Sequence, residues 1–145
     1  MTLDVMKLLP PGMSGPRDLA FWIFVMVTVM GTLRSLIHLL APDGGAASIA
    51  GLSLSGTYGA NVVALFGQWG ASQLVLAMVF WMVILRYRAL VPLMWMVVVA
   101  EQLLRIVAGR LKPLTSSRVP PGAYGTYALL ALSVGMLLCR LWHPS

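Results

Sequence analysis

The sequence predicts an all-α integral membrane protein, with four antiparallel transmembrane helices in a single domain over residues 1–145 and both termini on the same side. Composition is the first observation behind this prediction. Hydrophobic residues make up 59% of the chain and charged residues only 10%, whereas a soluble domain carries about 25% charged residues. The second observation is that the hydrophobic residues fall into four runs, each near the ~20 residues that a helix needs to cross a bilayer.

Helix start and stop signals separate the four runs. Asp18 is a suitable N-cap for the first run, and Pro42-Asp-Gly-Gly45 ends it. Gly109 and Pro113 are expected to end the third run, and the uncharged residues 44–58 to form a loop across the mouth of the bundle, with a re-entrant segment as the alternative. The predicted spans are therefore about 19–40, 59–85, 89–108 and 123–139.

The basic residues lie at the span ends and in the loops, where they orient a membrane protein. One predicted side holds Lys7, Arg17, Arg86, Arg88 and Arg140. The other side holds Arg110, Lys112 and Arg118. The positive-inside rule therefore predicts a multi-pass protein of the inner (cell) membrane with both termini in the cytoplasm. The net charge of +6 does not indicate a nucleic-acid partner, because the cations do not cluster on one polar surface.

The third span is interrupted by polar residues at Glu101, Gln102 and Arg105. A charged side chain at bilayer depth costs about 3 kcal/mol or more unless it is paired or hydrated. Glu101 and Arg105 are four residues apart, so they share a helix face and can pair. Ionisable residues inside a membrane span indicate a functional site.

Polar residues of the other spans fall at a similar depth. At 1.5 Å per residue they lie roughly 18–25 Å from the terminus side, in the far half of a core about 30 Å thick. We expect them to converge, with Arg34 and Arg105 sharing Glu101, so that a surplus positive charge favours an anionic or amphipathic small molecule. The predicted ligand-binding residues are Arg34, His38, Gln68, Gln73, Glu101, Arg105 and Tyr127.

Three alternatives remain open at this point. In the first, the arginines extend to the interface, Glu101 is only a counter-ion, and the glutamines bond neighbouring helices. In the second, His38 and Glu101 are a catalytic acid–base pair for isomerisation or redox chemistry on a lipid-soluble substrate. In the third, the protein is an accessory subunit whose polar residues face outward and bond to a larger membrane partner; a homo-oligomer or a larger membrane complex is the expected assembly in that case. His38, Asp43 and Glu101 lack the spacing of a metal motif, and the sequence identifies no cofactor.

Three short motifs resemble the DoxX-like group of small four-helix membrane proteins. They are Gly67-Gln-Trp-Gly70, Arg86-Tyr-Arg88, and Glu101 with Arg105 and Gly109-Arg110. The resemblance implies a four-span fold over the whole chain. It assigns no catalytic residue, because many members of the group have no assigned function.

Overall fold

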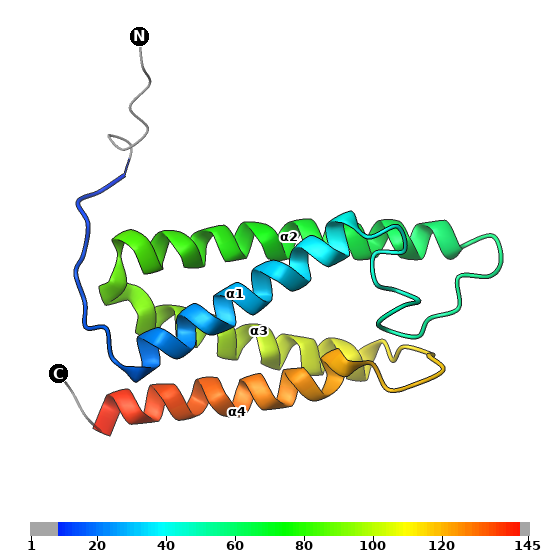
Figure 1. Ribbon diagram of the computed structural model, residues 1–145. Coiled ribbons are helices and arrows are strands. Elements are labelled where there is room, and N and C mark those ends of the chain that lie inside the picture. Colours follow the sequence, from blue (N-terminus) through cyan, green and yellow to red (C-terminus); the bar gives the residue numbers. More distant parts are fainter. Residues whose placement is uncertain (1–8, 143–145) are drawn as a thin grey trace, which may run out of the picture.

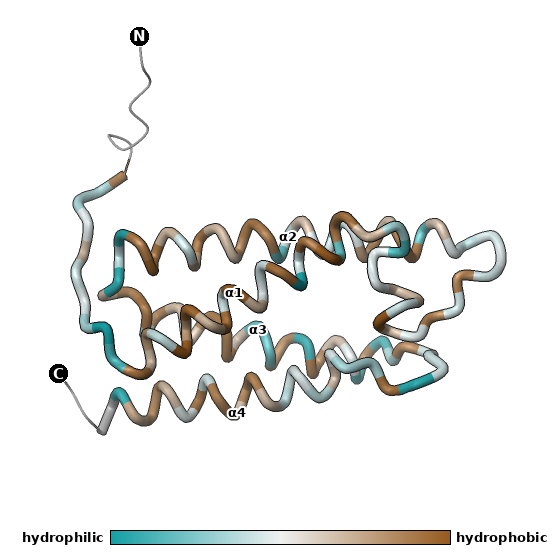
Figure 2. The backbone as a smooth tube through the Cα atoms, in the orientation of Figure 1, coloured by the Kyte–Doolittle hydropathy of each residue, from teal (hydrophilic) through white to brown (hydrophobic). Residues whose placement is uncertain are grey.

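The protein forms a bundle of four long helices in a computed structural model that describes residues 9–142 (Figure 1). Each helix is long and apolar enough to cross a membrane by length and composition, which confirms the predicted all-α class and its four spans. Hydrophobic colours predominate along the helices (Figure 2). The helices are α1 (Leu19–Leu40), α2 (Gly59–Arg86), α3 (Val91–Leu111) and α4 (Pro121–Trp142), with a 3-10 turn, η2 (Arg88–Leu90), between α2 and α3.

Prolines set two helix ends that differ slightly from the prediction. Helix α3 continues through Gly109 and ends at Leu111, because it is Pro113 that excludes the helical conformation at the residue before it. Helix α4 begins at Pro121 and not near residue 123. Proline suits the first position of a helix, where its missing N–H would have no partner.

Both described ends of the chain meet the α2–α3 turn at one end of the bundle, which we call the terminus end. Asp18 caps α1 by accepting a 2.9 Å hydrogen bond from the Phe21 N–H. Its second carboxylate oxygen pairs with Arg140 of α4. The Met13 N–H donates to the Arg86 carbonyl at 3.0 Å, which fixes the N-terminal segment against the end of α2.

Four of the five basic residues predicted for one membrane side lie at this terminus end, and Lys7 lies outside the described residues. Arg88 donates to the Gly15 carbonyl at 3.4 Å, and Arg17 directly precedes the Asp18 cap. The prediction that this side is cytoplasmic remains a prediction.

The helices pack as two pairs around an aromatic core. The closest backbone contacts join α1 to α2 and α3 to α4, with few contacts between the pairs. Phe24 of α1 lies 5.0 Å from Phe80 of α2 and 5.4 Å from Trp95 of α3, between ring centroids, and all three are buried. Helices in lipid associate through van der Waals packing, so this aromatic core joins the two pairs in the terminus half of the bundle.

Two loops close the opposite end, which we call the loop end. The first loop (residues 41–58) forms turns, and the second loop spans residues 112–120. The Ser117 N–H donates to the Gly51 carbonyl at 3.1 Å, and the Arg118 guanidinium donates to the Ser48 carbonyl at 2.5 Å. Each loop connects one helix pair, so these bonds link the two pairs at the loop end.

Asp43 organises the first loop and makes it sensitive to acid. Its carboxylate accepts backbone N–H bonds from Ser48 (2.7 Å), Gly45 (2.9 Å) and Ala47 (3.2 Å). Together these bonds lower the pKa of Asp43 from 3.8 to about 2, and the bond from the Ser48 N–H makes the largest contribution. Because the folded pKa lies below the ordinary value, this stabilisation is complete above about pH 4 and is lost as the pH falls towards 2.

We therefore expect the Ser48 amide resonance to titrate with a midpoint near 2 in an NMR pH series. Asp43→Asn is the control, because it removes the titrating group. A midpoint near 4 would show that the carboxylate does not hold these amides in solution.

Candidate functional site

Two adjoining cavities lie between the helix pairs. The first, which we call the inner chamber, has a volume of about 390 Å³ and is lined by all four helices. The second, the outer chamber, has a volume of about 600 Å³ and extends to both loops. Arg34 and Thr126 line both chambers and mark the junction between them. Both volumes are in the range of small-molecule sites, about 300–1,000 Å³.

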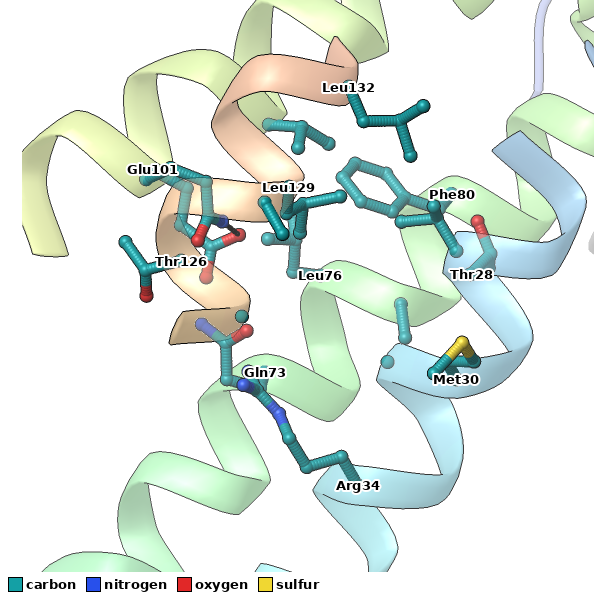
Figure 3. Close-up of a pocket in the computed structure, with 17 residues that line it drawn as sticks. Thr28, Met30, Arg34, Gln73, Leu76, Phe80, Glu101, Thr126, Leu129 and Leu132 are labelled. Atoms are coloured by element: carbon teal, nitrogen blue, oxygen red, sulfur yellow. Dashed lines mark hydrogen bonds between the residues drawn. The ribbon is translucent and has the colours of Figure 1, made fainter. Parts of the chain in front are cut away.

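The inner chamber has a polar end and an apolar end. Figure 3 shows Arg34 and Gln73 reaching in from α1 and α2, with Glu101 and Thr126 across from them. The rest of the labelled wall is mostly apolar and includes Leu76, Phe80, Leu129 and Leu132. The polar end adjoins the outer chamber through Arg34 and Thr126, so polarity falls with distance from the loop end.

The outer chamber is lined by four cations and by no carboxylate of the described chain. Arg34 comes from α1, Arg105 and Arg110 from α3, and Lys112 from the second loop. Apolar groups surround these cations, including Ile49, Ala50, Phe66, Trp69, Ile106 and Leu114. Cations on apolar walls of a concave site attract an anion, because the low-dielectric walls focus the positive potential.

Trp69 of α2 brings the two deep arginines together. The guanidinium carbon of Arg34 lies 5.1 Å from the Trp69 ring centroid, and that of Arg105 lies 4.9 Å from it. Both distances suit cation–π attraction. The His38 ring lies 4.7 Å from the same indole. Trp69 thus contacts a cation from each helix pair, and two like charges share one indole.

The predicted pair of Glu101 and Arg105 is present on α3. Arg105 donates to Oε1 of Glu101 from Nε at 3.0 Å and from Nη2 at 2.5 Å. The buried amide of Gln102 donates weakly to the other oxygen at 3.4 Å. Arg34 faces the same cavity as Glu101 but forms no ion pair with it among the described residues, so the two arginines do not share the carboxylate directly.

The carboxylates of the described chain are all engaged elsewhere. Only four acidic residues occur in the sequence, and Asp4 lies outside the described residues. Asp18 pairs with Arg140, Asp43 accepts bonds within the first loop, and Glu101 pairs with Arg105. Within residues 9–142, therefore, no carboxylate is left to pair with the other three cations of the outer chamber.

His38 is buried at the wall of the outer chamber. Its Nδ1 lies 2.7 Å from the Gly44 carbonyl oxygen; since a carbonyl only accepts, Nδ1 carries the proton and Nε2 is an acceptor in the neutral ring. Glu101 lines the other chamber, and among the described residues no hydrogen bond joins it to His38. Within residues 9–142, no group of three His, Cys, Asp or Glu side chains comes together as metal ligands.

The structure brings six of the seven predicted ligand-binding residues to the chambers. Gln73 and Glu101 line the inner chamber, and Arg34 lines both. Gln68 is exposed and lines neither chamber. The remaining three line the outer chamber: His38, Arg105 and Tyr127.

Four further residues of the site were not among those predicted. Trp69 shares a face of α2 with Gln73, four residues on, and this spacing could have identified it. The local sequence pattern could not assign three residues to the outer chamber, because their positions depend on how the second loop returns to the bundle: Arg110, Lys112 and Thr126.

Comparison with known proteins gives no match to a family, a curated protein or a solved structure. The resemblance to the DoxX-like group stays a prediction, and function has to be inferred from the geometry of the two chambers.

Proposed function

We propose that this protein binds an amphipathic anion between its helix pairs, with the anionic group in the outer chamber. The observation that supports this most directly is the charge of that chamber: four cations line it, and the one internal carboxylate nearby already pairs with Arg105. A guanidinium presents a planar fork of N–H donors that matches carboxylate or phosphate oxygens. Arg34 has no ion-pair partner within residues 9–142, so its donors are available to a ligand.

The placement of Arg34 also supports binding over a purely structural role. Holding two arginines against one indole opposes their mutual repulsion, and burial of an unpaired charge is costly. An anion between them removes both costs. The accessory-subunit alternative would place the polar residues on the outside of the bundle, whereas six of the seven candidate residues line the two chambers.

Binding can be tested in detergent with a short-chain lipid. We expect dioctanoyl phosphatidic acid to bind more tightly than dioctanoyl phosphatidylcholine, measured by calorimetry or by the ligand-dependent rise of Tm. Arg34→Gln is expected to weaken the anionic ligand by about tenfold to a hundredfold, because it removes a charge-assisted bond of roughly 1.5–3 kcal/mol.

Arg17→Gln is the matched control, since Arg17 is exposed and lies beside the α1 cap at the terminus end. It makes the same change of net charge far from the chambers. Equal affinity for the two lipids, or equal losses in the two variants, would contradict the proposal.

A further inference from the structure

The inner chamber is open on one side of the bundle. The exposed residues of its lining all belong to α1 or α4, while its lining residues from α2 and α3 are buried or half-buried. Met30 of α1 is 69% exposed, and Gly125 and Ala128 of α4 are exposed. Helices α1 and α4 have almost no backbone contacts with one another. The gap between them, at Met30, Gly125 and Ala128, is called the lateral opening here.

This opening lies at the depth of the acyl chains. Counting from the terminus end at 1.5 Å per residue, from Leu19 on α1 and from Arg140 on α4, Met30 lies roughly 17 Å deep and Ala128 roughly 18 Å deep, in a hydrocarbon core of about 30 Å. Both positions are beyond the midplane, in the leaflet at the loop end. The medium outside the opening is therefore lipid chain and not water.

The polarity of the two chambers matches the orientation of a lipid in that leaflet. Arg110 and Lys112 of the outer chamber lie at the loop end, near the interface. The apolar part of the inner chamber reaches Thr28 and Leu132, roughly 12–14 Å from the terminus end and thus close to the midplane. A lipid of the leaflet at the loop end has its headgroup and chain in this same order.

We infer that the ligand is an anionic membrane lipid that enters sideways between α1 and α4, with its headgroup in the outer chamber and a chain in the inner chamber. This inference rests on the proposed function and adds the class of ligand and its route. Arg34, at the junction of the chambers, binds the headgroup where it meets the chain. The apolar wall excludes water from the chain.

A photoreactive lipid tests the route. The protein is reconstituted in phosphatidylcholine vesicles that contain a small fraction of phosphatidic acid with a diazirine near the end of one chain. Phe80 and Val98 line the inner chamber and are only 6% and 1% exposed, so a chain can label them only from inside. We expect mass spectrometry to find label on these two residues, and less label from the same diazirine chain on phosphatidylcholine.

Two glycines of α4 supply a matched pair of variants. A side chain added at Gly125 or at Gly135 meets nothing within 4 Å of its Cβ, but only Gly125 lines the inner chamber. Gly125→Phe is expected to reduce labelling of Phe80 and Val98 by about tenfold, equivalent to about 1.4 kcal/mol, and Gly135→Phe to leave it unchanged. Equal labelling in the two variants, or label confined to outward-facing residues, would overturn lateral entry.

Two further results separate this inference from the proposed function. If dioctanoyl phosphatidic acid binds in an Arg34-dependent manner but the diazirine chain never reaches Phe80 and Val98, the binding site stands and lateral entry fails. If inorganic phosphate displaces dioctanoyl phosphatidic acid as effectively as the lipid displaces itself, the site takes a soluble anion and the lipid assignment fails. If dioctanoyl phosphatidic acid did not bind, or bound equally well to the Arg34→Gln variant, both the proposed function and the lipid inference would be overturned.

Discussion

Glu101→Gln is expected to lower the free energy of unfolding in detergent by about 2–3 kcal/mol, because it leaves the Arg105 cation without its carboxylate. A fully buried pair loses about 3–5 kcal/mol when one partner is removed; the side chains of Arg105 and Glu101 are 20% and 21% exposed, which reduces the loss. The unpaired Arg105 would also share the Trp69 ring with Arg34, a second cation, with no nearby negative charge. Unfolding by sodium dodecyl sulfate measures the effect.

The double variant Glu101→Gln with Arg105→Leu is the decisive comparison. The double variant has neither charge of the pair, so no charge of this pair is left without a partner. We therefore expect it to be more stable than Glu101→Gln alone and to recover at least about half of the lost free energy of unfolding. The single variant Arg105→Leu completes the cycle. If the two single effects simply added in the double variant, Glu101 and Arg105 would not interact in the folded protein.

Gly70→Ala is expected to cost about 1–3 kcal/mol, because α1 and α2 touch at this glycine. A Cβ there would lie 2.8 Å from the Leu39 nitrogen, 2.9 Å from the Ser35 carbonyl oxygen and 2.8 Å from the His38 Cβ. Two of these atoms are backbone, so α1 itself has to move away from α2. His38 would move with it, and the wall of the outer chamber would change.

Gly67→Ala is the control on the same helix, one turn earlier. Its added Cβ would meet only the His38 carbonyl oxygen, at an ordinary 3.9 Å. Alanine also favours a helix over glycine by up to about 1 kcal/mol, so this variant should be as stable as the parent or more stable. Thermal unfolding in the same detergent compares the two, and a similar loss in both would show that the close approach at Gly70 is not maintained.

The four spans could be predicted because each is encoded locally. A run of apolar residues, a cap such as Asp18 and a breaker such as Pro42 act within a few residues of one another, so the ends of α1 match the prediction. The Glu101–Arg105 pair is local for the same reason, since one helical turn joins the two residues.

The details of the site could not be predicted, because they depend on contacts between distant segments. Arg34 was expected to share Glu101, but it lies against Trp69, which was not among the predicted site residues. Counting residues along each helix predicted the depth of the polar side chains, but it could not predict which of them face the interior of the bundle. Gln68 and Gln73 show this, because both fall in the polar layer, but only Gln73 turns towards the chambers.

The arrangement of the helix pairs determines where the bundle can change shape at least cost. At the terminus end the pairs are joined by the buried rings of Phe24, Phe80 and Trp95, and separating these rings would forfeit many close contacts. At the loop end, within residues 9–142, the pairs are connected by exposed loop hydrogen bonds, each worth about 0.5–1.5 kcal/mol, and by the cation–π contact of Arg105 with Trp69. A small rotation about the aromatic core would therefore widen the chambers towards the loop end at lower cost than a separation of the helix pairs in the terminus half.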